Sequence, residues 1–476
     1  MKTQNATFKY FCTYIFSIYF SISFVYGYKV SGLTCESLKN PLGIETENPL
    51  LGWIIESDDK KDAQSAFQII VSDNPEEIKK GNGNMWDSGK IKSGKTNGIE
   101  YQGKRLQAQK RYFWSVRSYN EQDIASEWSE PAFFEMGMIH PSNWMAQWIG
   151  DGKRLPDNIF DFQRNDPTPL LRKDWIIKKA VASARLYIAG TGYYETYLNG
   201  QKAGEYFPDS ECFSPETITY NTFDVTDMLQ QGKNTWSVIL GNRIYPSSPM
   251  KLFKLSNEYK TTNRPAILGQ LEILYTDGHK ERILTDLTWK TIPSPITQHD
   301  TYSGEHYDAR AEISGWNLPG SETFGWRNVV FADVPAKVLK SQMCPTVKKY
   351  PLKPIKITKP LPQTCIFDMG QNITGVIRLK IEGERGTKIS IRYGNKILPD
   401  EHVDPMIIIT KPDTNLLTKQ GQQIIRQEDS YILKGHKAEE IWQPKFTLHK
   451  FRYVEITGFP KDLSLENIEG ILFNFN

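Results

Sequence analysis

The sequence predicts an all-β fold made of three consecutive β-sandwich-like modules. The chain has 476 residues, which is enough for about three domains. Short apolar or alternating runs recur about every eight to twelve residues, separated by Gly, Asn, Asp and Pro, which is the spacing of strands in sandwiches. No long stretch repeats its apolar residues with a helical period, so only a few short helices are expected.

The first module is expected over residues 28–137. Residues 112–117 alternate the large buried candidates Tyr112, Trp114 and Val116 with outward positions. Residues 128–129 and 133–135 follow at strand spacing. This pattern predicts a fibronectin type III-like sandwich with a tryptophan in its core.

The second module is expected over residues 148–334 and the third over residues 335–476. In the second, residues 186–188 and 236–240 predict strands, and Asn199-Gly200 is a strong hairpin signal. In the third, strands are predicted at residues 389–393 and 453–456, and the apolar residues from 468 to 475 indicate a last strand.

Composition and charge set limits on function. Hydrophobic residues make up 39% of the chain and charged residues 24%, which excludes wholesale disorder. Lysine and arginine number 58 against 55 aspartates and glutamates, a net charge of +3, so no nucleic acid partner is expected. Aromatic residues make up 12%, which permits a sugar binder, although most of these residues are expected in sandwich cores.

The N-terminus has the features of a secretory signal. Lys2 and Lys9 form a positive region, and residues 10–26 are apolar and aromatic without a charge. Residues 1–27 are therefore predicted to be a cleaved signal, with the mature protein exported to the periplasm or out of the cell. The segment is too short for a convincing membrane anchor, so no membrane partner is expected.

The cysteines of the mature chain give no sign of a metal or redox site. They lie far apart and form no C-x-x-C pair, which argues against zinc and against a redox motif. Export permits a disulfide, but buried free thiols are the preferred interpretation. The four residues are Cys35, Cys212, Cys344 and Cys365.

Motifs spread over nearly the whole mature chain resemble the N-terminal β-sandwich part of bacterial α-L-rhamnosidases, glycoside hydrolase family 78. They occur in the family's order. In the first module they are Asn48-Pro49-Leu50-Leu51-Gly52-Trp53, Trp86-Asp87-Ser88-Gly89-Lys90 and Tyr112-Phe113-Trp114-Ser115-Val116-Arg117. In the later modules they are Gly192-Tyr193-Tyr194-Glu195-Thr196-Tyr197-Leu198-Asn199-Gly200, Phe223-Asp224-Val225-Thr226, Tyr307-Asp308-Ala309-Arg310, Phe367-Asp368-Met369-Gly370-Gln371-Asn372 and Phe451-Arg452-Tyr453-Val454-Glu455.

The resemblance implies a substrate class of acidic polysaccharides that contain rhamnose and uronic acid, with or without sulfate. In that family an (α/α)6 barrel follows these β-domains and supplies the catalytic acid and base. Inverting glycosidases need two carboxyl groups about 6.5–9.5 Å apart. None of the family's barrel motifs is present in this sequence, so we expect this protein not to be a rhamnosidase.

Two stretches depart from the family pattern. Gly241-Asn242-Arg243-Ile244-Tyr245 stands where the family usually has Gly-Asn-Gly-Trp-Tyr, and His306 stands where a small or apolar residue often precedes Tyr-Asp-Ala-Arg. Both stretches belong to the second module. As neighbouring loops they would surround one cleft with Arg243, Tyr245, Tyr302, His306, Tyr307 and Arg310.

These side chains suit β-elimination at a terminal uronate, by a carbon–oxygen lyase or a dehydratase. Arg243 and Arg310 would neutralise the carboxylate of an acidic rhamnose-containing oligosaccharide. The catalytic candidates are His306, Tyr307 and Tyr302, one to take the C5 proton and one to protonate the leaving oxygen. Tyr245 and Asn242 are further substrate-binding candidates.

Other interpretations stay open. For Asp308 and Arg310, a structural ion pair is preferred over a catalytic role. A single histidine such as His306 is more often a surface residue than a catalytic base. The protein can instead be a non-catalytic rhamnose or polysaccharide binder. In that case Asn242 and Asp209 are weak candidates for holding Ca²⁺. An inactive relic, or a rhamnosidase-type hydrolase with an unrecognised site, also remains open.

Overall fold

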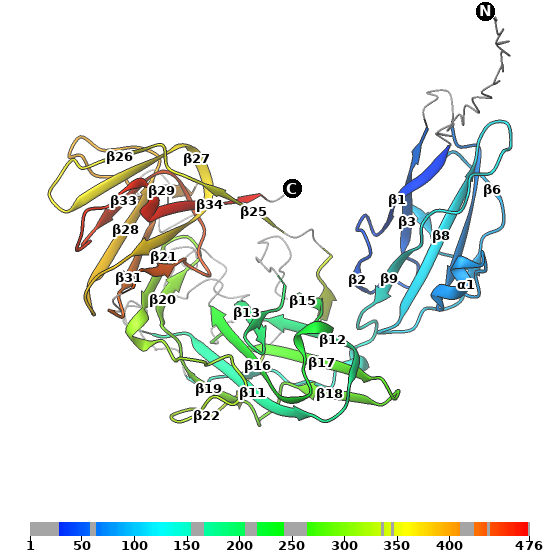
Figure 1. Cartoon of the computed structure of the whole chain (residues 1–476), viewed down its shortest axis with the longest axis horizontal. Helices are drawn as coiled ribbons and strands as arrows, with labels where there is room; N and C mark the ends of the chain where they lie inside the picture. Colours follow the sequence, from blue (N-terminus) through cyan, green and yellow to red (C-terminus); the bar gives the residue numbers. More distant parts are fainter. Residues whose placement is uncertain are drawn as a thin grey trace, which may run out of the picture. The chain divides into compact units, whose positions relative to one another are not determined.

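The chain divides into two compact units in the computed structural model (Figure 1). The structure describes residues 28–57, 63–153, 166–204, 217–241, 264–334, 338–343, 347–409, 423–435 and 438–474. The first unit holds residues 1–39, 50–104 and 112–132, and the second unit holds residues 40–49, 105–111 and 133–476.

The first unit is built from antiparallel strands in two sheets. One sheet has the order β1-β3-β7, with bounds Lys29–Cys35, Leu50–Glu56 and Ile99–Glu100. In the other, β4 lies between β8 and β5 and also pairs with β6, with bounds Ala66–Ser72, Arg111–Tyr119, Trp86–Asp87 and Ile91–Lys92. The short helix α1 (Pro75–Lys79) is capped by the Asn74 side chain.

Large aromatic side chains fill the core of the first unit. Tyr112, Trp114 and Val116 are fully buried, as their alternation predicted. The Trp53 ring packs edge-on against Phe67 at 5.0 Å between centroids. This confirms the prediction of a sandwich with a tryptophan core for the first module.

The second unit begins with a two-sheet sandwich. One sheet has the order β23-β10-β17-β12-β15-β24, with β18 also paired to β17. Its strands span Val330–Phe331, Ile149–Gly150, Ile267–Tyr275, Val181–Gly190, Thr217–Asp224, Val338–Ser341 and Lys280–Leu284. The other sheet has the order β14-β13-β16-β11-β19-β22, with strands Gln201–Lys202, Tyr193–Leu198, Gly232–Gly241, Pro169–Ile177, Lys290–Pro293 and Arg327–Asn328. The short strand β2 (Leu42–Ile44) pairs in parallel with β9 (Ala132–Met136).

Local sequence explains the turn and the core of this sandwich. Asn199 and Gly200 both have positive φ values, 51° and 84°, as a tight hairpin turn between β13 and β14 requires. In the core, Trp236 packs edge-on against Trp289 at 4.8 Å. The Trp236 indole N–H donates to the Thr196 hydroxyl at 2.8 Å, so its polar atom is satisfied in the interior.

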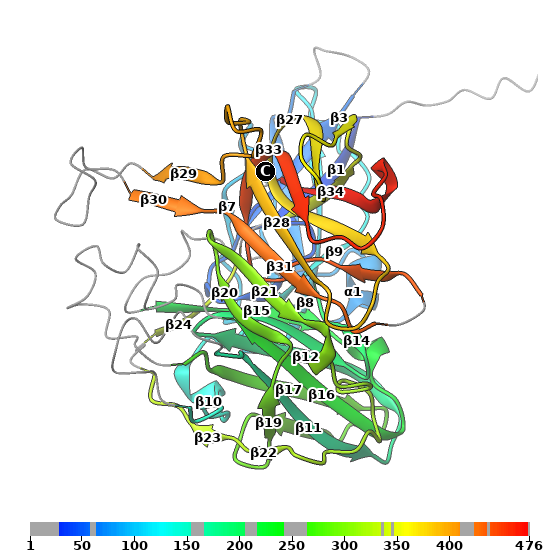
Figure 2. The same ribbon diagram turned by 90° about the vertical axis from the view of Figure 1, so that its left-hand side faces the viewer.

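The C-terminal sheet has the order β20-β21-β31-β28-β33-β27-β34-β25, with β26 and β32 also paired to β27. The eight strands span Ile296–Asp300, Gly304–Asp308, Glu428–Ile432, Lys388–Gly394, His449–Thr457, Thr364–Ile381, Ile468–Asn474 and Lys348–Leu352, and β26 and β32 span Lys356–Thr358 and Glu440–Trp442. Strands β29 (Met406–Ile409) and β30 (Gln423–Arg426) form a separate hairpin, which stands apart in Figure 2.

The hairpin β20–β21 belongs to this C-terminal sheet, although its residues precede position 334, where the sequence suggested a module boundary. Figure 2 shows β21 beside β31, and the two strands pair in parallel, with His306 opposite Ser430 and Tyr307 opposite Tyr431. Gly304 has a φ of 130°, and a Cβ there would lie 1.9 Å from the Glu428 carbonyl oxygen. Only glycine lets the hairpin approach β31 so closely.

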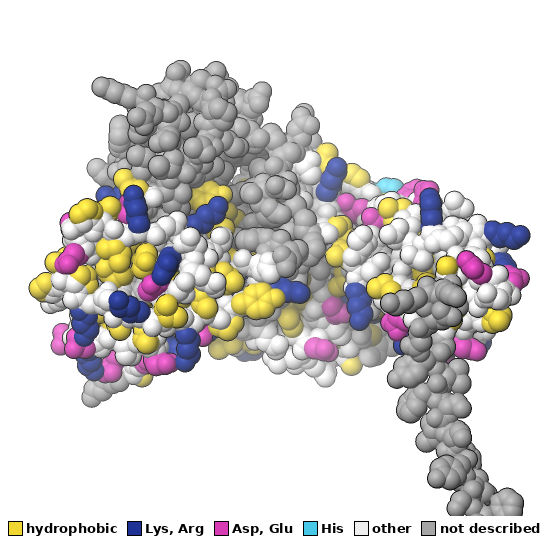
Figure 3. Space-filling view, turned by 90° about the horizontal axis from the view of Figure 1, so that it is seen from above, with side chains coloured by type: hydrophobic (Ala, Val, Ile, Leu, Met, Phe, Trp, Pro, Cys, Tyr) yellow, Lys and Arg dark blue, Asp and Glu magenta, His cyan; other side chains and the backbone are white. Residues whose placement is uncertain are grey.

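Helical structure is sparse in the described residues, which confirms the all-β prediction. Besides α1, the chain forms short 3₁₀ turns at Pro141–Asn143, Thr226–Met228, Ala309–Ala311 and Leu465–Asn467. On the face drawn in Figure 3, Lys and Arg side chains lie among Asp and Glu side chains. This mixture is what the small net charge of +3 leads one to expect.

Two of the cysteines lie in described residues, and both are buried free thiols. Cys35 ends β1 in the first unit, and Cys365 lies in β27 of the second unit. Burial raises the pKa of each thiol above its ordinary value. Cys212 and Cys344 lie outside the described residues.

We predict that Trp236→Ala destabilises the second unit by about 3–5 kcal/mol, because it removes a fully buried indole and leaves a cavity beside Trp289. Thermal or urea denaturation measures the loss. Phe324→Ala is the control, since Phe324 is 95% exposed and such a surface change should stay within about 0.5 kcal/mol. Equal shifts for the two variants would contradict this account of the core.

Candidate functional site

The structure places Tyr302, His306, Tyr307 and Arg310 on or next to the hairpin β20–β21. Tyr302 lies in the turn, where its backbone N–H donates to Asp300 at 3.0 Å. His306 and Tyr307 lie on β21, and Arg310 lies in the 3₁₀ turn that follows. These four residues are therefore close in sequence and in structure, but they do not all face one pocket.

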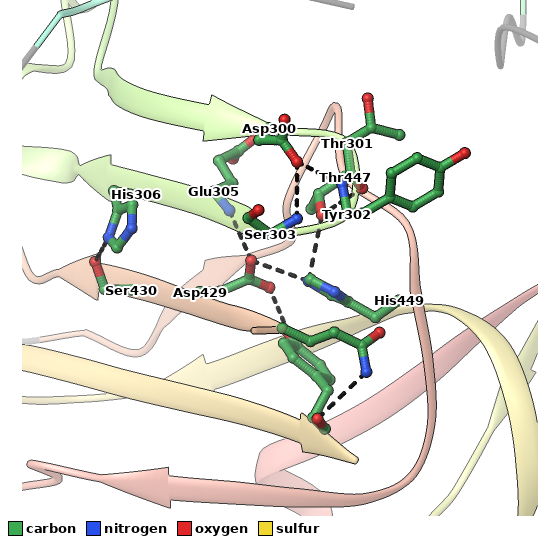
Figure 4. Close-up of polar contacts among 12 residues, drawn as sticks. Asp300, Thr301, Tyr302, Ser303, Glu305, His306, Asp429, Ser430, Thr447 and His449 are labelled. Atoms are coloured by element: carbon green, nitrogen blue, oxygen red, sulfur yellow. Dashed lines mark hydrogen bonds and ion pairs between the residues drawn. The ribbon is translucent and has the colours of Figure 1, made fainter. Parts of the chain in front are cut away.

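His306 is partly buried against β31. Its Nδ1 lies 2.7 Å from the Ser430 hydroxyl (Figure 4). Burial lowers the pKa of His306 below its ordinary 6.5, although the nearby Asp429 carboxylate acts in the opposite direction. The imidazole is therefore neutral at pH 7 and is held by a hydrogen bond within the sheet.

Tyr307 and Arg310 each have a partner on the protein. The Tyr307 hydroxyl donates to Glu312 at 3.1 Å, and burial together with this carboxylate raises the pKa of Tyr307. Arg310 binds Asp308 through two hydrogen bonds of 2.8 and 2.7 Å. This is the structural ion pair that the sequence favoured for these two residues.

The other predicted site residues lie outside the described residues. These are Asn242, Arg243 and Tyr245, with the calcium candidate Asp209. A cleft shared by Arg243, Tyr245, His306 and Arg310, and binding roles for these residues, stay predictions. Among the residues described, no group of three or more His, Cys, Asp or Glu side chains is arranged to hold a metal ion.

A pocket of about 560 Å³ opens in the second unit, between β13 of the sandwich and the C-terminal sheet. Its walls combine aromatic and charged side chains. They are Tyr193, Tyr194, Glu195, Tyr197, Lys202, Tyr307, Glu312, Lys349, Pro351, Arg378, Ile441, Trp442, Gln443, Pro444, Lys445, Phe446, Ile471 and Phe473. Of the predicted site residues that the structure describes, Tyr307 alone lines this pocket.

Strand β13 supplies one wall of the pocket through the alternation of its side chains. Tyr194 and Leu198 point into the sandwich core. Tyr193, Glu195 and Tyr197 therefore point to the opposite face, because successive side chains on a strand alternate. The Tyr193 ring stacks on Phe446 with 6.1 Å between centroids and 15° between planes.

Glu195 is the centre of a charged network in the pocket. Its carboxylate accepts from Lys202 at 2.8 Å, from Lys445 at 2.9 Å and from the Tyr197 hydroxyl at 2.6 Å. Burial by itself would raise the pKa of Glu195, but Lys445 and Lys202 outweigh it and lower the pKa to about 2. Glu195 is thus an anion shared by two lysines at any pH near neutrality.

Glu305 on β21 holds the backbone that carries Lys445. Its Oε2 accepts from the backbone N–H groups of Lys445 at 3.0 Å and Phe446 at 3.3 Å. Its side chain is fully buried. Burial, with a smaller contribution from Asp429, raises the pKa of Glu305 from 4.5 to about 8. At neutral pH Glu305 is therefore a protonated acid.

Asp429 on β31 is the polar partner beneath this hairpin (Figure 4). It accepts from the Glu305 backbone N–H at 2.7 Å and from the Tyr393 hydroxyl at 2.5 Å. Its Oδ1 lies 3.1 Å from His449 Nε2, and both side chains are completely buried. These contacts tie β21 to β31 and fix its position, although Glu305 Oε1 and His449 Nδ1 are buried without a hydrogen-bond partner among the described residues.

Three family models match the chain in succession. Residues 30–140 match the Rha78A-like N-terminal immunoglobulin domain, residues 179–351 match the α-L-rhamnosidase N-terminal domain, and residues 358–474 match the bacterial α-L-rhamnosidase concanavalin-like domain. The chain therefore corresponds to the N-terminal β-sandwich part of bacterial α-L-rhamnosidases, the carbohydrate-active proteins of glycoside hydrolase family 78.

Individual relatives agree with these matches. An α-L-rhamnosidase of Formosa agariphila is 32% identical over 458 residues, which are 93% of this chain and 46% of the relative. An α-L-rhamnosidase of Alteromonas sp. is 32% identical over 432 residues, which are 89% and 44%. The structure of the α-L-rhamnosidase from Dictyoglumus thermophilum is 36% identical with a TM-score of 0.81 over 94% of this chain and 49% of that one. The chain spans about half the length of these relatives.

The comparisons overturn the expectation of a carbon–oxygen lyase that is not a rhamnosidase. That expectation is wrong, because the relatives are named α-L-rhamnosidases, which are hydrolases. The described candidates also have partners within the protein. The raised pKa of Tyr307 keeps its phenol protonated at neutral pH, His306 is hydrogen-bonded to Ser430, and Arg310 is paired with Asp308.

Sequence reasoning missed Glu195, Lys202 and Lys445. The alternation of Tyr193, Glu195 and Tyr197 within a strand would have placed an acid between two aromatic side chains on one face. Lys445 comes from a segment 250 residues further along the chain. No local pattern could assign this lysine to Glu195.

We predict that Glu305 makes stability fall as pH rises between about 4.5 and 8. The folded chain keeps the Glu305 proton up to about pH 8, whereas the unfolded chain loses it near 4.5, so unfolding releases a proton in this window. The free energy of unfolding then falls by at most about 1.4 kcal/mol per pH unit from this group. Melting temperatures at pH 5, 6.5 and 8 measure the slope.

Glu305→Gln should remove this contribution, because the amide is neutral at every pH and similar in shape. Melting temperature should fall less steeply between pH 5 and 8 in this variant than in the wild type. The control Glu466→Gln changes a glutamate whose side chain is 73% exposed and should keep the wild-type slope. Parallel pH curves for wild type and Glu305→Gln would contradict a buried, protonated Glu305.

Proposed function

We propose that this protein is an α-L-rhamnosidase-type glycoside hydrolase acting on rhamnose-containing carbohydrate, and that the described residues form its β-domain region. The observation that carries the proposal is the succession of three rhamnosidase domain models between residues 30 and 474. The 36% identical structure, with a TM-score of 0.81 over 94% of this chain, supports it further.

The pocket of the described region is suited to recognition rather than to proton transfer. A glycoside hydrolase needs one carboxyl group that donates a proton and one that acts as a base or nucleophile. The acidic side chains lining the pocket are Glu195 and Glu312, and both are ion-paired. Glu195, with its pKa lowered to about 2, has no proton to donate at neutral pH.

A second candidate function is carbohydrate binding without catalysis. The pocket between β13 and the C-terminal sheet favours it, because aromatic side chains next to charged ones are typical of sugar-binding sites. On either candidate the partner is a rhamnose-containing oligosaccharide. That this oligosaccharide is acidic is part of the proposal.

The two candidates are separated by assaying the full chain with an aryl α-L-rhamnoside and, in parallel, titrating it with L-rhamnose in a calorimeter. The first candidate predicts release of the aryl alcohol, with an aryl β-D-glucoside as the negative control. Binding of L-rhamnose without release would favour the second candidate and contradict the first. Neither release nor binding would overturn both.

We also propose that the protein is exported. The positive residues Lys2 and Lys9 followed by the uncharged apolar residues 10–26 support this. Among the residues described, no helix has the length and apolarity to cross a membrane. N-terminal sequencing of protein from periplasmic and culture fractions should find a chain that begins near residue 28. An intact Met1 on protein confined to the cytoplasm would contradict export.

A further inference from the structure

We propose that Glu305 and residues 445–448 form a pH-sensitive latch in the second unit, which is closed while Glu305 keeps its proton and opens locally when that proton is lost. The latch belongs to one wall of the pocket, because Lys445 and Phe446 both line it. The inference goes beyond the proposed function. It concerns how this wall is held, and not which sugar the pocket takes or whether a rhamnoside is cleaved.

On one side the latch segment is attached to the hairpin β20–β21. Glu305 Oε2 accepts from the backbone N–H groups of Lys445 at 3.0 Å and Phe446 at 3.3 Å. The Leu448 backbone N–H donates to the Thr301 carbonyl oxygen at 2.7 Å. Two of these three backbone contacts therefore depend on one titratable side chain.

On the other side the same segment is attached to the sandwich through β13. The Lys445 ammonium donates to Glu195 at 2.9 Å, and the Phe446 ring stacks on Tyr193. The segment thus joins the hairpin to the sandwich beside the pocket. Release of its backbone from Glu305 would loosen both side chains that it contributes to the pocket wall.

Glu305 is placed where a negative charge is costly. Its side chain is fully buried, and its Oε1 has no hydrogen-bond partner among the described residues. The Asp429 carboxylate lies close by (Figure 4) and disfavours a second anion. A charged Glu305 would leave Oε1 without a donor in the interior, whereas local opening lets water reach it. Loss of the proton therefore favours the open form.

Other titratable groups surround Glu305 on every side. They are His299 on β20, Tyr307 on β21, Tyr393 on β28, Asp429 on β31, His449 on β33 and Lys445. Burial lowers the pKa of His299 to about 3 and raises the pKa of both tyrosines, so these three groups are neutral between pH 5 and 8. Burial would lower the pKa of Lys445, but Glu195 outweighs burial and raises it, so Lys445 stays cationic.

The direction of the pH effect follows from the raised pKa of Glu305. Closed, the latch keeps the proton up to about pH 8, whereas an opened, hydrated Glu305 loses it near 4.5. Opening therefore releases a proton between these values, and its equilibrium constant rises by at most about tenfold per pH unit. The latch is most stable below pH 4.5 and weakens until the pH passes about 8.

Hydrogen exchange of the full chain without ligand, followed by mass spectrometry at pH 5.5, 6.5 and 7.5, tests the latch. Protection of residues 445–448, corrected for the intrinsic pH dependence of exchange, should fall by about tenfold per pH unit. Strand β4 in the first unit is the internal control and should keep its protection. Strand β27 should stay better protected than the latch segment at each pH, because it lies inside the C-terminal sheet.

Glu305→Gln assigns the effect to its side chain. The amide is neutral at every pH and can still accept from the two backbone N–H groups, so protection of residues 445–448 should no longer change with pH. Glu466→Gln is the matched control, because its side chain is 73% exposed, and should keep the wild-type pH dependence. Circular dichroism spectra show that both variants are folded.

Three results would overturn the latch. The first is wild-type protection of residues 445–448 that does not change with pH, a result that needs no variant. The second is the same fall in Glu305→Gln as in the wild type, which would assign the effect to another group such as His449. The third is equal protection of the segment and β27 at every pH, which would mean global unfolding only. Each leaves the proposed function standing, because the aryl rhamnoside assay tests that separately.

Discussion

The parallel pairing of β21 with β31 is the constraint on which the rest of the candidate site depends. It joins residues that lie 124 positions apart, His306 and Ser430, and so brings a hairpin from the middle of the sequence into the C-terminal sheet. The pairing buries Glu305 at the place where the segment containing Lys445 passes. Closing so long a loop has an entropic cost, and the backbone pairing together with the buried contacts of Asp429 offsets it. Without this pairing, the Lys445 backbone would lose the carboxyl group that fixes its position.

The pocket shows how an electrostatic site can be built on rigid strands. Glu195 is placed by the alternation of β13, and Lys202 follows from the tight turn at Asn199-Gly200. Both lysines donate to the Glu195 carboxylate, and their charges keep it ionised although it is buried.

The sequence was sufficient for the all-β fold class because the relevant signals are local, but not for the placement of the hairpin β20–β21 in the C-terminal sheet. The alternation at Tyr112, Trp114 and Val116 and the Asn199-Gly200 turn depend on neighbouring residues, and the structure agrees with both. The candidate site was different. His306 attracted attention as a departure from the family pattern, but its contact with Ser430 belongs to the sheet. The Glu195–Lys445 pair depends on residues 250 positions apart. A contact of that kind follows from the packing of two sheets, and the local sequence does not predict this packing.

In the part of the chain that the structure describes, each unit contains one buried thiol, Cys35 in the first and Cys365 in the second. The thiolate is the form that reacts with alkylating reagents, and burial raises the pKa of both groups. In the closed state neither sulfur is accessible or ionised at neutral pH. Modification then requires β1 to detach from β3, or β27 to open within the C-terminal sheet. Cys35 and Cys365 are thus built-in probes of local opening, and labelling rates followed at each of these two residues report the opening of each part separately.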